Sequence, residues 1–113
     1  MDIAVEELAG GVAKVVLRGR FDTTGAVVVE LPFHKIATEK GRIIVDLSAV
    51  NFLSSYGIRV LLVGAKIVNG KGGQMVIVCP DKTVARILKM AGADTLIPTF
   101  PSESAAAAAL APS

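Results

Sequence analysis

The chain has 113 residues, of which 52% are hydrophobic and 4% aromatic, and a formal net charge of +2 at pH 7. This length suits one domain with a modest core, and no apolar run approaches the about 20 residues that a membrane helix needs. Scattered lysines and arginines with few aromatic rings argue against nucleic acid. We therefore expect a single domain over residues 1–113, with neither a nucleic-acid nor a membrane partner.

Disulfide and metal chemistry has few residues available. Cys79 is the only cysteine and His34 the only histidine, which excludes an internal disulfide and argues against a zinc site. We expect His34 to be solvated or half-packed, and we expect no cofactor. The first residues contain no basic segment followed by an apolar one, so we expect no secretory signal and a cytoplasmic protein.

The first predicted elements are two strands that form a hairpin. Residues 3–8 and 12–18 are short runs rich in Val, Ile and Leu. They are joined by Ala9-Gly10-Gly11, whose glycines can take positive φ angles.

The segment 24–40 predicts a helix that is kinked or starts late. Its apolar residues keep a helical period, but Val27, Val28 and Val29 prefer strands, and Pro32 cannot donate a hydrogen bond to residue 28.

Two continuous apolar runs, 43–47 and 75–79, predict central strands covered on both faces. A helix expected over residues 55–69 makes them parallel neighbours joined by a crossover. Gly64 in the middle of that helix indicates a close approach to another element. Asp46, at the expected end of the first strand, should accept local backbone hydrogen bonds.

The apolar residues from Val84 to Ala91 follow the i, i+3, i+4, i+7 spacing of a helix. Asp81 is placed to cap the first turn, and Gly92 follows the last. We expect a short strand around residues 96–97 after it.

The C-terminal segment predicts one more helix. Ser102 is placed as the N-cap of residues 103–110, whose alanines are the best helix formers. The alternative is a low-complexity linker, but the cap favours a helix that docks on the domain.

Ser54 and Ser55 occupy the N-cap and first position of the helix expected over residues 55–69. The amides of residues 56–58 would have no partner inside the helix and would suit an anion such as phosphate. Gly57 has no side chain and would leave the backbone accessible to a binding partner. Serine pairs before helices usually only cap, so the pattern alone leaves both roles open.

Three stretches together resemble the STAS domain of bacterial anti-sigma-factor antagonists. "VDLSAVNFLSSYGIRVLL" is similar to the family signature Asp-Leu-Ser-x-Val-x-Phe-(apolar)-Asp-Ser-(Ser/Thr)-Gly-(apolar), and "GGQMVIVCPDKTVARILKMAGADTLIPTF" resembles the family's next segment. Upstream, "LRGRFD" resembles the family's Leu-x-Gly-x-Leu-Asp. The likeness covers nearly the whole chain in the same order. It implies an α/β domain with a small mixed sheet and about four helices.

The resemblance also implies a function. In the family, a serine kinase that is also the anti-sigma factor phosphorylates the serine that corresponds to Ser55. The unmodified antagonist binds the kinase and frees the sigma factor, the phosphorylated form is released, and a metal-dependent serine phosphatase resets it. The chain is then a switch in transcription regulation and not an enzyme. The expected partner-binding residues are Asp22, Ser54, Ser55, Tyr56, Gly57 and Arg59.

Two residues depart from the family signature. Ser54 stands where the family has an aspartate, and Tyr56 where it has Ser or Thr. Either the kinase is altered to match, or the switch is lost and only the binding surface remains. Ser54 is also a second candidate phosphate acceptor.

Other functions are weighed against this one. A serine nucleophile needs a nearby base, and His34 lies in a different predicted helix, which disfavours an enzyme. The alternatives are a phosphorylation-independent scaffold subunit or a module that binds a nucleotide or another anion at Ser55. The oligomeric state stays open between a monomer and a weak dimer.

Overall fold

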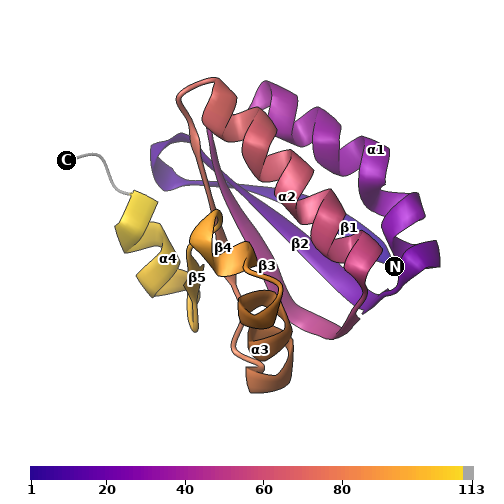
Figure 1. Ribbon diagram of the computed structural model, residues 1–113. Helices are drawn as coiled ribbons and strands as arrows, with labels where there is room; N and C mark the ends of the chain where they lie inside the picture. Colours follow the sequence, from indigo (N-terminus) through magenta and orange to yellow (C-terminus); the bar gives the residue numbers. More distant parts are fainter. Residues whose placement is uncertain (111–113) are drawn as a thin grey trace.

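The computed structural model describes residues 1–110. Their five strands form one mixed sheet (Figure 1). The last three residues of the predicted domain, 111–113, lie outside the described residues. The strand order is β1-β2-β3-β4-β5; β1 and β2 are antiparallel and the other neighbours are parallel. The strands are β1 (Asp2–Leu8), β2 (Val12–Phe21), β3 (Arg42–Leu53), β4 (Gln74–Val78) and β5 (Thr99–Phe100).

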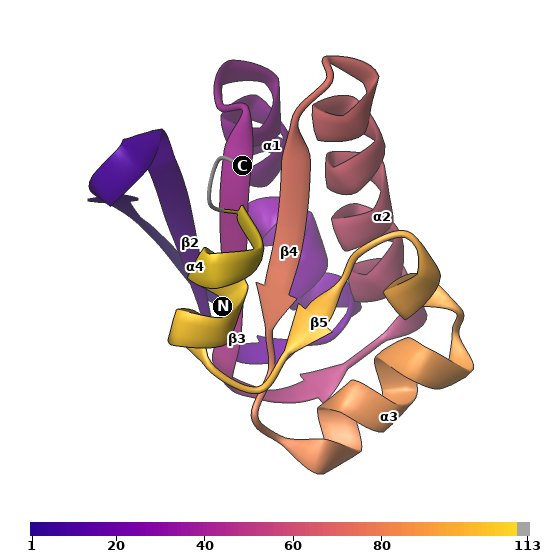
Figure 2. The ribbon, with the colours of Figure 1, turned by 90° about the vertical axis from the view of Figure 1, so that its left-hand side faces the viewer.

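Helices cover both faces of the sheet. The described part of the chain has four α-helices: α1 (Thr23–Glu39), α2 (Ser55–Gly70), α3 (Lys82–Met90) and α4 (Glu103–Leu110). Figure 2 shows α1 and α2 on one face and α4 on the other. The predicted α/β class with four helices is therefore confirmed. No helix within residues 1–110 is both long and apolar enough to cross a membrane.

The hairpin and the crossover are also confirmed. Gly10 and Gly11 take φ angles of 78° and 75° in the turn between β1 and β2, which glycine allows at little cost. α2 crosses between the parallel strands β3 and β4. Gly64 lies against the ring of Phe33 of α1, where a β-carbon would clash, so the predicted close approach joins α1 to α2.

β3 is longer than predicted, and Asp46 lies inside it instead of at its end. Its pairing with β2 shifts register twice, after Val16 and after Gly19. The buried residues Leu47, Val50 and Leu53 are therefore three apart. A regular strand alternates with a period of two, so the residues after Leu47 do not show the pattern of a strand although β3 continues to Leu53.

α1 starts at Thr23 and is one helix to Glu39, so of the two predicted alternatives, a kink or a late start, the late start is wrong. The Asp22 carboxylate accepts a hydrogen bond from the Gly25 amide at 2.8 Å and caps the first turn. This cap and the burial of Val29 outweigh the weak helix propensity of the valines. Pro32 lies inside the helix on its exposed side.

The predicted cap of α3 is confirmed, and the predicted position of the following strand is wrong. Asp81 caps α3 by accepting from the amides of Thr83 and Val84 at 2.8 and 3.1 Å. The strand expected at residues 96–97 begins only at Thr99. The Ile97 amide instead donates to the Ala93 carbonyl, which completes a helical turn.

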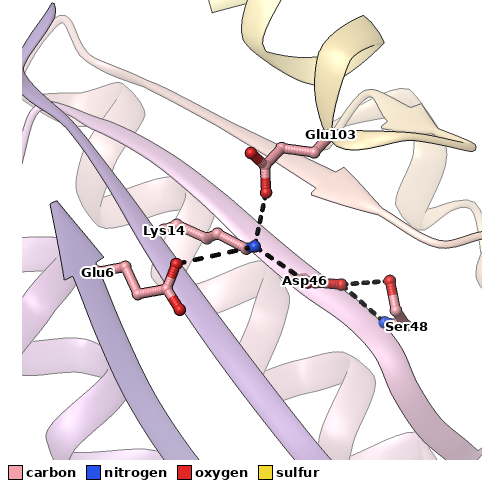
Figure 3. Close-up of polar contacts among 5 residues, drawn as sticks. All are labelled: Glu6, Lys14, Asp46, Ser48 and Glu103. Atoms are coloured by element: carbon pink, nitrogen blue, oxygen red, sulfur yellow. Dashed lines mark hydrogen bonds and ion pairs between the residues drawn. The ribbon is translucent and has the colours of Figure 1, made fainter. Parts of the chain in front are cut away.

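α4 docks on the sheet as predicted, with Ala106 and Leu110 buried. A lysine adds a polar attachment beneath it (Figure 3). Lys14 Nζ lies 2.5 Å from a carboxylate oxygen of Glu103, and also contacts Asp46 at 3.7 Å and Glu6 at 3.9 Å. The proximity of these carboxylates raises the pKa of Lys14, with the Glu103 hydrogen bond the largest cause.

Asp46 also accepts the local hydrogen bond that its position predicts. The Ser48 amide donates to Asp46 Oδ1 at 2.8 Å, and the Ser48 hydroxyl donates to the same oxygen at 2.5 Å (Figure 3).

Candidate functional site

The serine bend, residues 53–57, joins the end of β3 to the start of α2. The Ser54 amide donates to the Phe21 carbonyl at 2.9 Å, which fastens the bend to the end of β2. α1 and α2 both begin at this end of the sheet, after the parallel strands β2 and β3 (Figure 1). Residues from two strands and two helices therefore meet here.

The two serines have different roles. Ser54 is the N-cap of α2: its half-buried side chain accepts from the Gly57 amide at 3.1 Å. Ser55 is the first helical residue and is exposed. Its hydroxyl makes no hydrogen bond within residues 1–110, so it is available to another molecule.

The anion site at the helix start is smaller than predicted. The Gly57 amide is taken by the Ser54 hydroxyl, and the Ile58 amide donates to the Ser54 carbonyl at 3.0 Å. At the start of α2, the amides of Ser55 and Tyr56 are then the two left without an intrahelical or capping partner. Two amides and the helix dipole can still receive a charge attached at Ser55 itself.

Gly57 does not leave the backbone open, and that expectation is wrong. The residue is buried. A β-carbon added there would lie 2.8 Å from a ring carbon of Phe21 and 3.0 Å from the Phe21 carbonyl oxygen. Glycine is required because α2 packs directly on the end of β2, and the position offers no surface for a partner.

Tyr56 is half-buried and points its hydroxyl toward α1. The hydroxyl donates to Glu30 Oε1 at 2.7 Å. This hydrogen bond, together with desolvation and the glutamate charge, raises the pKa of Tyr56. The side chain therefore joins the first turn of α2 to the middle of α1.

Asp22 has a structural role and also lies at the rim of the serine bend. It caps α1, and it follows Phe21, whose carbonyl binds the Ser54 amide. Arg20 Nε lies 3.4 Å from Asp22 Oδ2, and its guanidinium is 4.0 Å above the Phe52 ring centroid. Arg59 is exposed one turn after Ser55 on α2.

Two residues at this site escape prediction from sequence, Glu30 and Arg20. Glu30 is brought to Tyr56 only by the packing of α1 on α2, and no local pattern marks it. Arg20 carries a weak signal, because it is a basic residue only two positions before the acidic Asp22.

His34 is half-packed, as predicted. Its Nε2 lies 3.1 Å from the Val60 carbonyl oxygen, so the ring engages the backbone of α2. Within residues 1–110, no group of three or more His, Cys, Asp or Glu side chains could hold a metal ion.

One family model matches most of the chain. The STAS domain model matches residues 5–106. The anti-sigma F factor antagonist of Paenibacillus polymyxa is 28% identical over 106 residues, 91% of each chain. A crystal structure of an anti-sigma factor antagonist from Mycobacterium paratuberculosis has a TM-score of 0.82 at 26% identity, over 96% of this chain and 92% of that one.

A more distant structure shares the fold. The Bacillus cell fate determinant SpoIIAA in its phosphorylated form has a TM-score of 0.71 at 14% identity, over 96% of this chain and 99% of that one. Since the family model spans the sheet, α1 to α3 and the serine bend, the chain belongs to the STAS domain family.

Proposed function

We propose that this protein is an anti-sigma-factor antagonist that acts by binding and not by catalysis. In its unmodified form it binds an anti-sigma factor that is also a serine kinase. Phosphorylation of Ser55 releases it, and a serine phosphatase restores the binding form. The proposed location of this exchange is the cytoplasm.

The observation that carries the proposal is that Ser55 is exposed and that its hydroxyl makes no hydrogen bond within residues 1–110. A kinase can reach this oxygen without breaking any hydrogen bond that the described residues make. The Ser54 oxygen is half-buried and caps α2, so a phosphate there would cost the cap. This contrast favours Ser55 over Ser54 as the acceptor.

A phosphate on Ser55 would change the surface charge with little change in the fold. It brings about −1.5 to −2 charges. The free amides of Ser55 and Tyr56 and the helix dipole would stabilise that charge, and Arg59 lies one turn away on α2. A partner that covers the bend would meet an added charge, and we expect release for that reason.

The relatives support the binding role. The matched proteins from Paenibacillus polymyxa and Mycobacterium paratuberculosis are named anti-sigma factor antagonists. SpoIIAA, which shares the fold, has been solved in a phosphorylated form.

The test is a phosphorylation assay with each anti-sigma factor kinase of the source organism, purified separately and supplied with ATP. Peptide mass spectrometry locates any phosphate, and Ser55→Ala is the control. Phosphate on Ser55 that is lost in the control supports the switch. Phosphate only on another residue would exclude it.

The second candidate is a scaffold subunit that binds without phosphorylation. Ser54 in place of the family's aspartate and the Tyr56–Glu30 hydrogen bond favour this candidate. Tight binding to a kinase that transfers no phosphate would identify it. A nucleotide- or anion-binding module has less support, because two of the four amides at residues 55–58 are already occupied.

A further inference from the structure

α1 carries an unusual concentration of exposed apolar side chains. Within residues 1–110, five large hydrophobic side chains are exposed, and three of them lie within five positions of α1. These three, Val27 and Val28 at 57% exposure and Leu31 at 80%, are called here the α1 patch.

The sequence of the α1 patch is unfavourable for an isolated surface helix. Exposed helix positions are normally filled by strong helix formers, and valine is a weak one because its branched side chain loses rotamer freedom there. From Thr23 to Leu31 the only charged residue is Glu30. All three side chains are more than half exposed, so the described chain gains little packing energy from them. Contiguous exposed apolar residues of this kind mark interaction surfaces.

The α1 patch adjoins the serine bend. Val27 and Leu31 are one turn apart and share a face of α1, and Glu30 lies beside them at the edge toward α2. The Glu30 carboxylate accepts the hydrogen bond from the Tyr56 hydroxyl at 2.7 Å. α1 and α2 lie side by side with their first turns at the same end of the molecule (Figure 1). One surface therefore continues from Ser55 across Tyr56 to Leu31.

We propose that the α1 patch is the apolar half of the surface that docks the anti-sigma factor. This inference rests on the proposed function and extends it, because it assigns partner affinity to residues outside the phosphate-accepting bend. The anti-sigma factor would present apolar side chains to Val27 and Leu31, with polar contacts at Ser55. An apolar centre with a polar rim is the usual anatomy of such an interface. Ser55 then controls release, and the α1 patch supplies affinity.

The experiment compares the double variant Val27→Gln/Leu31→Gln with Met90→Gln. Met90 is 81% exposed on α3 and provides a matched control for losing an exposed hydrophobic residue. Glutamine is uncharged and a good helix former, so neither variant adds charge or breaks a helix. Affinity is measured by calorimetry against each purified anti-sigma factor of the source organism, and melting temperature and oligomeric state are recorded for every variant.

We expect the double variant to bind at least about tenfold more weakly than the wild type at an unchanged or higher melting temperature, and Met90→Gln to stay within about twofold. If the wild type binds and Ser55→Asp weakens binding, but the double variant binds normally, the α1 patch inference is wrong and the proposed function stands. If the wild type binds no anti-sigma factor, the proposed function fails. If the wild type is a dimer that the double variant dissociates, with affinity for the anti-sigma factor unchanged, a second copy covers the patch and the inference is overturned.

Discussion

Ser54 and Ser55 are chemically identical and adjacent, yet backbone geometry gives them separate tasks. Ser54 has extended dihedral angles, φ −87° and ψ 167°, which turn its hydroxyl back to the Gly57 amide. Ser55 is the first residue of the helix and is exposed. Of these two adjacent serines, the first therefore has a structural role as the cap of α2, and the second is the proposed phosphate acceptor.

Aspartate at position 54 should preserve the stability of the protein, whereas alanine should lower it. Ser54→Ala loses the cap and should lower the free energy of unfolding by about 1 kcal/mol, whereas aspartate caps about as well as serine. If the family's kinases recognise the aspartate, Ser54→Asp should also raise the rate of phosphate transfer. Urea unfolding and initial transfer rates measure the two effects. Equal transfer rates for the wild type and Ser54→Asp would show that position 54 does not determine recognition.

Gly57 should not tolerate even a methyl group. Gly57→Ala places a β-carbon 2.8 Å from the Phe21 ring, and we expect a loss of about 1–3 kcal/mol in the free energy of unfolding. Gly70, the last residue of α2, has nothing within 4 Å of its added β-carbon. Gly70→Ala is the matched control and should leave stability equal or slightly raised. A stable Gly57→Ala variant would contradict the packing described for α2.

Among the elements, those whose local signals agreed could be predicted. The hairpin, α2, α3 and α4 each combine an apolar pattern with a cap or a glycine turn at the expected place. The bounds of β3 and β5 could not be predicted correctly. The register shifts between β2 and β3 disturb the alternation of buried residues along β3. The helical turn that includes Ile97 means that β5 begins only after Pro98. Such features depend on neighbouring strands, which no local pattern records.

α4 is the element whose attachment can be tested most simply. Lys14→Met keeps the length of the side chain but removes the contact with Glu103, so α4 should loosen and stability should fall by up to about 1 kcal/mol, as for other ion pairs near the surface. Limited proteolysis near residue 103 and urea unfolding measure the change.

The contribution of Lys14 to the stability of the folded protein depends on pH in a defined way. The pKa of Lys14 is raised above its ordinary value of 10.5 in the folded protein. The stabilisation is therefore fully present below about pH 10.5 and is lost as the pH rises through the higher folded pKa. The stability difference between the wild type and Lys14→Met should be constant from neutral pH to about pH 9 and shrink above about pH 10.5. A difference that grows with alkaline pH would contradict this assignment.

At the scale of the whole molecule, one face of the sheet carries α1, α2 and the serine bend, and the other carries α4 and its lysine contact (Figure 2). The family resemblance anticipated the position of Ser55, Ser54 and Asp22 at one end of the sheet. It did not anticipate the buried Gly57, the Tyr56–Glu30 hydrogen bond or the α1 patch. The burial of Gly57 depends on how α2 packs on Phe21 at the end of β2. The Tyr56–Glu30 hydrogen bond depends on how α1 packs on α2, so both features join residues that are far apart in sequence.

The central claim is that charge at Ser55 controls binding without changing the fold. The most direct measurement is the affinity of Ser55→Asp and Ser55→Ala for the anti-sigma factor that binds the wild type, together with the melting temperature of each variant. We expect Ser55→Asp to bind at least about tenfold more weakly, because burying an added charge without a counter-ion costs several kcal/mol. Ser55→Ala should bind at least as well as the wild type, and both variants should stay folded. Unchanged affinity for a folded Ser55→Asp variant would contradict the account and leave Ser55 as no more than the first residue of α2.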